Sequence, residues 1–63
     1  MTASKFIVQG WRARKYNDLW SGYDRERAII QATKSYNIRN HKIIRVIEIK
    51  SEQIEIYRWK NDD

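Results

Sequence analysis

The side chains that could support catalysis are few and scattered along the chain. The 63 residues include one histidine, His41, in a polar turn before a strand-like segment, where we expect a solvated loop residue. A histidine general base needs an orienting partner and a nucleophile within reach. The serines stand at predicted turns or element ends, where serine ordinarily bonds to the backbone: Ser4, Ser21, Ser35 and Ser51. The sequence therefore offers no candidate nucleophile–base pair.

Two glutamates, Glu48 and Glu55, are expected to face each other across the last predicted hairpin, like a catalytic carboxylate pair. Solvated cross-strand charges, opposite Lys50 or Arg58, are the commoner explanation of such a pair. The chain has no cysteine and one histidine, whereas a zinc site takes about four ligands. We therefore expect no metal, no cofactor and no enzymatic activity, and the function classes left are those of binding proteins.

Basic residues supply the candidate nucleic-acid site. The formal net charge is +5, and residues 1–45 carry ten Lys/Arg against three Asp/Glu. The candidate contacts are the cations of the first turn and of the helix start: Arg12, Arg14, Lys15, Arg25 and Arg27. Arginines among sheet aromatics can hold unpaired bases, at roughly 1–3 kcal/mol for each stacked base. The glycine–aromatic signature of the common RNA-binding sheet is missing, and a solubilising surface paired with nearby carboxylates is the competing interpretation.

Aromatic and acidic residues supply the candidate protein-binding site. Three tryptophans and four tyrosines exceed what a core of this size needs, and both types are enriched at interface hot spots. The candidate partner-binding residues are Trp11, Trp20, Glu48, Glu52, Glu55, Tyr57 and Trp59. Open sheet edges also allow a partner to add a strand. Two other interpretations of the aromatic residues stay open, namely a second small core behind the sheet and a homodimer seam.

The strand-like segments at the two ends of the chain must position most of these aromatics. Residues 5–12 and 52–59 alternate in polarity, which predicts two strands with distinct faces. The expected aliphatic face holds Phe6, Val8, Ile54 and Ile56, and the expected aromatic face holds Ile7, Trp11, Tyr57 and Trp59. A single helix covers only one face of a small sheet, so we expect the aromatic face to be open. Gly10 predicts a bulge or a close approach by another group.

The middle of the chain predicts a turn, a helix and two further strands. Residues 14–17 read as a hairpin turn with Asn17 in a left-handed conformation, and residues 18–23 as a return strand, with a loop as the alternative. Asp24 is a suitable N-cap for a helix from Arg25 to about Tyr36. Residues 42–50 carry β-branched side chains on both faces, which is typical of a central strand.

The predicted fold is α+β, with a small antiparallel sheet of three to four strands in the order β-β-α-β-β and one helix on one face. We expect a single domain over residues 1–63, near the lower size limit for independent folding. The expected core residues are Phe6, Val8, Ala28, Ile29, Ala32, Tyr36, Ile54 and Ile56, together with either Ile44 and Val46 or Ile43, Ile47 and Ile49. No apolar run approaches the roughly 20 residues of a membrane span, so a cytoplasmic location is expected.

The layout resembles a known family. An apolar strand closes in Gly10-Trp11, a polar turn and a return segment follow, and a single helix carries Ala32-Thr33 before Tyr36 and two closing strands. In these features, over almost the whole chain, it resembles short phage accessory proteins, namely the Dmd-type antitoxins of T-even phages. The resemblance implies a stoichiometric inhibitor that neutralises a host ribonuclease toxin by occupying its active-site groove.

The chain departs from that family in being more basic and in carrying Trp20 and Trp59. A groove that accommodates RNA is usually electropositive, so its inhibitor is expected to present acidic groups. The candidates are Glu48, Glu52, Glu55, Asp62 and Asp63. We therefore expect a phage-type accessory protein that blocks a host toxin or defence nuclease, with a nucleic-acid-binding module and a homodimeric structural protein as alternatives.

Overall fold

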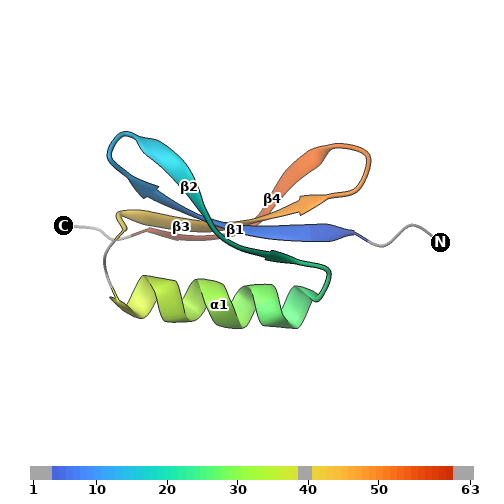
Figure 1. Ribbon diagram of the computed structural model, residues 1–63, viewed down its shortest axis with the longest axis horizontal. Helices are drawn as coiled ribbons and strands as arrows, with labels where there is room; N and C mark the ends of the chain where they lie inside the picture. The colour runs from blue at the N-terminus through green and yellow to red at the C-terminus, as the bar shows by residue number, and fades with distance from the viewer. Residues whose placement is uncertain (1–3, 39–40, 61–63) are drawn as a thin grey trace.

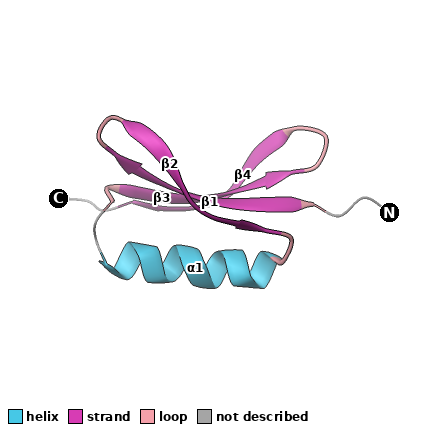
Figure 2. Ribbon diagram, viewed as in Figure 1, coloured by secondary structure: helices cyan, strands magenta, loops and turns pink. Residues whose placement is uncertain are grey.

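The computed structural model describes residues 4–38 and 41–60, which form four strands and one helix. In chain order these are β1 (Lys5–Arg12), β2 (Lys15–Gly22), α1 (Arg25–Ile38), β3 (Ile43–Ile49) and β4 (Gln53–Lys60). The strands build one layer and the helix lies along one side of it as the second (Figures 1 and 2). The predicted α+β fold and its element order are confirmed.

The sheet is antiparallel throughout, with the strand order β2-β1-β3-β4. The first and last strand pairs are hairpins, and pairing of β1 with β3 joins them side by side. The two hairpin turns lie at opposite ends of the long axis, and both hairpins bend away from the helix (Figure 1). Strand β3 has a neighbour on each side, as its two-sided apolar pattern predicts.

The first hairpin turn is shorter than the sequence suggests. Arg12 pairs with Lys15, so only Ala13 and Arg14 lie in the turn, with φ angles of 57° and 63°. Positive φ at both central residues suits the right-handed twist of the flanking strands. The prediction of a left-handed Asn17 was wrong: Asn17 belongs to β2, and its side-chain amide donates to the carbonyls of Arg12 and Lys15. Strand β2 consequently starts three residues earlier than predicted.

The helix starts at the predicted N-cap. The carboxylate of Asp24 accepts hydrogen bonds from the backbone N–H groups of Glu26 at 3.0 Å and Arg27 at 3.3 Å. These bonds satisfy two of the amides that a helix start leaves without a helical partner. The helix then continues to Ile38, two residues beyond the predicted end. The sequence also suggests Asn37 and Asn40 as residues that bracket the helix end. Asn37 instead lies within the helix, and Asn40 lies outside the described residues.

A β-bulge in β4 changes the predicted faces of the last strand. Tyr57 pairs with Val46, but Glu55 pairs with Ile47, which leaves Ile56 as an extra residue. A bulge interrupts the strict alternation of side chains between the two faces of a strand. Residues on the two sides of the bulge therefore cannot be assigned from the alternating pattern alone.

As a consequence, the prediction of one aromatic face was wrong for β4. Trp59 pairs with the fully buried Ile44 and packs against the core on the helix side of the sheet. Tyr57 also lies on that side, where Arg25 of the helix donates to its hydroxyl at 3.1 Å. Trp11 of β1 lies on the opposite face, as predicted. The two end strands therefore share no aromatic surface.

Strand β2 contains the corresponding bulge. Trp20 pairs with Val8 and Asp18 pairs with Gln9, which makes Leu19 the extra residue. Trp20 lies on the helix side and packs against the core. Its ring extends over Gly22, where an added Cβ would lie 2.7 Å from the indole. Each outer strand thus uses a bulge to direct a large aromatic residue toward the helix.

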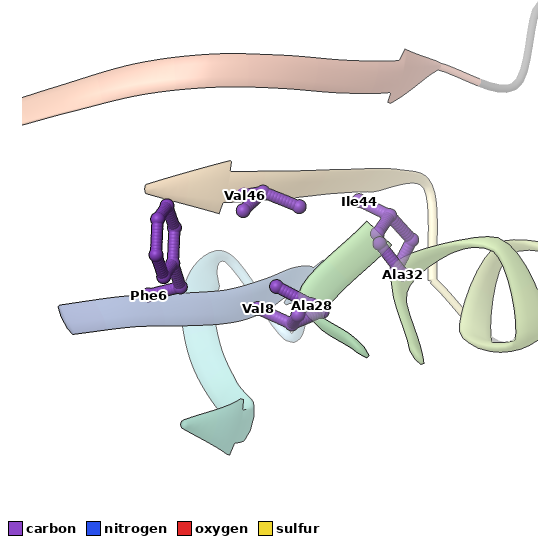
Figure 3. Close-up of a cluster of buried hydrophobic side chains, with 6 residues drawn as sticks. All are labelled: Phe6, Val8, Ala28, Ala32, Ile44 and Val46. Carbon is purple, nitrogen blue, oxygen red and sulfur yellow. The ribbon is translucent and has the colours of Figure 1, made fainter. Parts of the chain in front are cut away.

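The core lies between the helix and the two inner strands. Figure 3 shows its six buried members, which are Phe6, Val8, Ala28, Ala32, Ile44 and Val46. Partly buried residues pack around them: Trp20, Tyr36, Ile56 and Trp59. Ile54, which was predicted to be a core residue, is instead 49% exposed. The helix packs on β1, β3 and, less extensively, β2, so the far edge of the sheet has little cover.

Candidate binding surfaces

His41 is not the solvated loop residue that the sequence suggests. It is partly buried, and its ring lies so close over Gly10 that an added Cβ there would be 2.5 Å away. This confirms the predicted close approach at Gly10, while the bulge lies on the neighbouring strand at Leu19. The Nδ1 atom of His41 is buried, and no hydrogen-bond partner for it lies among the described residues. Its position is that of a packing residue.

His41 borders a small hollow with a volume of about 80 Å³. Its lining is formed by Leu19, Ser35, Ile38 and His41. No hydrogen bond joins Ser35 to His41 in the described part of the chain, and the other two lining residues, Leu19 and Ile38, are aliphatic. Ser35 and His41 therefore border the same hollow without forming a hydrogen-bonded pair among the described residues.

Glu48 and Glu55 do not face each other. Glu48 pairs with Ile54 on the helix side of the sheet, whereas Glu55 pairs with Ile47 on the other side. The two carboxylates therefore point to opposite faces, and a shared proton between them is excluded by the register. Residues 4–38 and 41–60 also contain no group of three or more His, Cys, Asp or Glu placed to hold a metal ion.

The face of the sheet opposite the helix, here called the open face, carries a chain of polar contacts across all four strands. The Gln9 amide donates to Asp18 at 2.8 Å, and the Arg45 guanidinium donates to the Gln9 carbonyl oxygen at 2.9 Å. Arg45 also lies 3.9 Å from Glu55, which accepts two hydrogen bonds from Arg58. Through this open-face network each strand is tied to its neighbour by side chains as well as by the backbone.

Glu55 is therefore occupied within the protein. Its hydrogen bond and its negative charge raise the pKa of Arg58 above the ordinary value of a guanidinium. All of these contacts use its Oε1 atom, and the residue as a whole is exposed. Glu55 therefore belongs to the open-face network, and its role as a partner contact stays a prediction.

An aromatic pair lies at one end of the open face. Trp11 and Tyr16 sit on paired strands with ring centroids 5.0 Å apart and an interplanar angle of 70°, an edge-to-face arrangement. The Arg45 guanidinium lies 3.5 Å from the centroid of the Tyr16 ring, which covers one side of that ring. Trp11, the other member of the pair, is partly exposed.

The helix side of the β3–β4 hairpin forms a second surface, here called the β4 shelf. Its residues are Glu48, Ile54, Tyr57 and Trp59. Ile54 is 49% and Tyr57 is 37% exposed, although both lie on the side that the helix covers elsewhere. The shelf borders a free sheet edge because β4 is the last strand of the described sheet. It combines exposed apolar surface with a carboxylate and an unpaired strand edge.

The partner-binding residues predicted from the sequence divide among these surfaces. The shelf brings together Glu48, Tyr57 and Trp59, and Glu52 lies in the turn next to it. Trp20 lies on the opposite outer strand, and Trp11 lies on the open face with Glu55. Asp62 and Asp63 lie outside the described residues. The structure thus assembles part of the predicted set and adds Ile54, which the alternating pattern had assigned to the core.

The predicted nucleic-acid residues also divide. Arg12, Arg14 and Lys15 surround the first hairpin turn, whereas Arg25 and Arg27 open the helix at the other end of the long axis (Figure 1). Two cations that the sequence did not single out lie at the same end as the turn. Lys42 donates its backbone N–H to the carbonyl of Trp11, and Lys60 pairs with Ile43. We call Arg12, Arg14, Lys15, Lys42 and Lys60 the basic end.

Comparison of the chain with protein-family models, with curated proteins and with solved structures found no match. Within the described ranges, no helix has the length and apolar character needed to cross a membrane.

Proposed function

We propose that this protein is a binding protein that docks a protein partner on the β4 shelf. By the resemblance to phage antitoxins, the partner would be a host toxin or defence nuclease whose active-site groove is blocked, in the cytoplasm of the host cell. The observation that carries the proposal is the exposure of Ile54 and Tyr57 on an edge strand beside the helix. Arg25 and Trp59 contact Tyr57, but 37% of Tyr57 and 49% of Ile54 remain accessible.

The shelf has the composition of an interface centre. Tyrosine and tryptophan dominate interface hot spots, where truncation of one side chain typically costs 2 kcal/mol or more of binding energy. Tyr57 is held in place by the hydrogen bond from Arg25 and by the ring of Trp59, whose centroid lies 6.1 Å away. A side chain already ordered in the unbound protein loses less conformational entropy on binding. The shelf is therefore prepared for contact.

Charge complementarity supports a basic partner surface. Glu48 lies on the shelf and Glu52 lies in the adjoining turn, whereas Glu55 is held by Arg45 and Arg58. Two carboxylates beside an apolar patch suit a groove that is electropositive because it accommodates RNA. Among the described carboxylates of the last hairpin, Glu48 and Glu52 are thus the ones beside the shelf, and Glu55 lies on the opposite face.

The test is capture from a nuclease-treated host lysate, followed by purification of the recovered protein and measurement of its dissociation constant. We expect Ile54→Gln and Tyr57→Ala to weaken binding at least tenfold, since each removes a shelf contact. Ile30→Gln is the matched control because Ile30 is similarly exposed, at 51%, but lies on the helix. The purified partner's nuclease activity should fall to zero at one equivalent of the wild-type protein.

Two results would contradict the proposal. Recovery of nucleic acid alone from untreated lysate, with no protein after nuclease treatment, would remove the basis for a protein partner. Sedimentation of the pure protein as a stable dimer that Tyr57→Ala dissociates would assign the shelf to a homodimer seam instead. Circular dichroism of each variant checks that the fold is retained.

A further inference from the structure

We infer that the basic end binds single-stranded nucleic acid, with its cations on the phosphates and with Trp11 stacked on a base. This site is separate from the β4 shelf and does not depend on the function proposed for the shelf. It uses residues that the structure gathers at one end of the sheet, two of which are separated from the others by more than 25 positions in the sequence.

The charge distribution supports the first part of this inference. The described residues include twelve lysines and arginines, and five of them form the basic end. The remaining seven share the rest of the described surface with all six described carboxylates. The ion pairs within residues 4–38 and 41–60 involve other cations, namely Arg27, Arg45 and Arg58. A cluster of one sign, away from the described carboxylates, attracts a polyanion.

Strand pairing brings the members of the basic end to the same end of the sheet. Arg12 and Lys15 are paired across the first hairpin, and the turn between them holds Arg14. The hydrogen bond from Lys42 to the Trp11 carbonyl places the entry to β3 next to the same hairpin. Lys60 then closes the row from the far side of β3. The cations therefore border one end of the sheet from all four strands or their connections.

The aromatic pair supports the second part. Trp11, Tyr16, Ile43 and Lys60 face the open side along one line across the sheet. Trp11 is partly exposed, while one side of the Tyr16 ring is already covered by Arg45. Trp11 is therefore the ring available for an incoming base. Bases that are unpaired can stack in this way, whereas a duplex keeps its bases inside, and this favours a single strand.

The conformation of the turn agrees with a binding role. Ala13 and Arg14 both have positive φ, which glycine or asparagine would adopt at lower cost. A non-glycine residue in this region is strained, and such strain is found where function places a side chain. Here the strained position puts the Arg14 side chain at the tip of the hairpin.

The inference is tested by fluorescence anisotropy with labelled RNA and DNA single strands of about 12 nucleotides, within the usual site sizes of such proteins. A duplex of the same length is the comparison probe. With five phosphate contacts, the affinity of the wild-type protein should fall about 100-fold between 50 and 200 mM salt, and that of Arg12→Gln/Arg14→Gln only about 20-fold. The double variant should also bind more weakly at 50 mM salt.

The matched control is Arg25→Gln/Arg27→Gln, which removes the same charge from the opposite end of the molecule. Its salt dependence should equal that of the wild-type protein. Base stacking is followed separately by tryptophan fluorescence. Quenching by the oligonucleotide should disappear in Trp11→Phe and persist in Trp20→Phe and Trp59→Phe, because the latter two tryptophans pack against the core.

Equal weakening by both double variants would show attraction by net charge alone and would overturn the inference. Tighter binding of the duplex than of either single strand would do the same, as would quenching that survives in Trp11→Phe. Ile54→Gln changes the shelf without changing charge, so it should leave oligonucleotide binding unaltered. A negative result for protein binding at the shelf can therefore be distinguished from a negative result for oligonucleotide binding at the basic end.

Discussion

The two hairpins of this protein are built alike but end in different surroundings. In each, the outer strand has one bulge, at Leu19 in β2 and at Ile56 in β4. An aromatic residue follows each bulge directly and faces the helix side, Trp20 in one hairpin and Tyr57 in the other. Trp20 packs against the core, whereas Tyr57 remains 37% exposed. The same local device thus contributes to the core in one hairpin and to a surface in the other.

The position of the helix accounts for this difference. Ala28 and Ala32 are fully buried, and their small side chains let the helix approach the inner strands closely. The helix also packs on β2 but has few contacts with β4. Tyr36 does reach toward the end of β4, where its hydroxyl lies 3.5 Å from the carbonyl of Lys60. Apart from this contact and the one between Arg25 and Tyr57, the helix leaves β4 largely uncovered, and the shelf opens toward Ile54.

The largest effect is expected from comparing an isoleucine under the helix with one on the shelf. Ile44→Ala should lower the free energy of unfolding by about 3 kcal/mol, because it removes buried methyl groups and leaves a cavity. Ile54→Ala should cost less than about 1 kcal/mol, because half of its surface is already in water. Urea unfolding followed by circular dichroism measures both. Equal losses would show that the shelf is covered in solution, for example by a second copy of the chain.

A smaller effect, of opposite sign, is expected at the turn of the first hairpin. Replacing Ala13 and Arg14 by Asn and Gly should stabilise the protein by about 1–2 kcal/mol, since both replacements accept positive φ. The midpoint of urea unfolding should rise accordingly. The same double variant should lose oligonucleotide affinity, because it removes the Arg14 charge.

Ala13→Asn alone separates the two effects. It keeps every charge of the basic end, so it should raise stability with no loss of binding. If stability did not rise in either variant, the left-handed turn would not exist in solution, and the placement of Arg14 at the hairpin tip would need another explanation.

The sequence was sufficient to locate the strands and the helix but not to predict on which side of the sheet each side chain of the outer strands lies. Polarity patterns located all four strands and the helix, and Asp24 marked the start of the helix, because both signals are local. The bulges at Leu19 and Ile56 depend on pairing with strands distant in the sequence, and no residue at either position signals them. This is why Tyr57 and Trp59 were assigned to the wrong face. Ile54 lies on the predicted face but is exposed, because the helix packs mainly on the other three strands.

The candidate surfaces illustrate the same limit. Arg12, Arg14 and Lys15 are neighbours in the sequence and were predicted together, whereas Lys42 and Lys60 join them only through strand pairing. Gln9 and Arg45 were not predicted as functional or structural residues, because their role depends on contacts between strands. Isolated polar residues in apolar strands, such as these two, are the signal that could have indicated a network on the open face.

That network joins the two hairpins and provides the third prediction. Arg45→Met keeps most of the side-chain volume but removes the hydrogen bond to Gln9, the contact with Tyr16 and the ion pair with Glu55. We expect the free energy of unfolding to fall by about 1 kcal/mol. The guanidinium is only partly screened by water, and the Gln9 carbonyl oxygen would lose the donor to which it is bonded. The midpoint of urea unfolding reports it. The aromatic signals of Tyr16 in NMR spectra should shift as the cation leaves its ring.

The smallest effect is expected at the solvent end of the same network. The Arg58 side chain is 48% exposed and pairs with Glu55, which Arg45 also contacts. Exposed ion pairs are screened by water and salt, and the entropy of ordering two long side chains opposes them. Arg58→Gln should therefore leave the urea midpoint unchanged within error at physiological salt. If Arg58→Gln instead lowered the urea midpoint as much as Arg45→Met does, both arginines would act as one unit. Strand β4 would then be held to the sheet chiefly through Glu55.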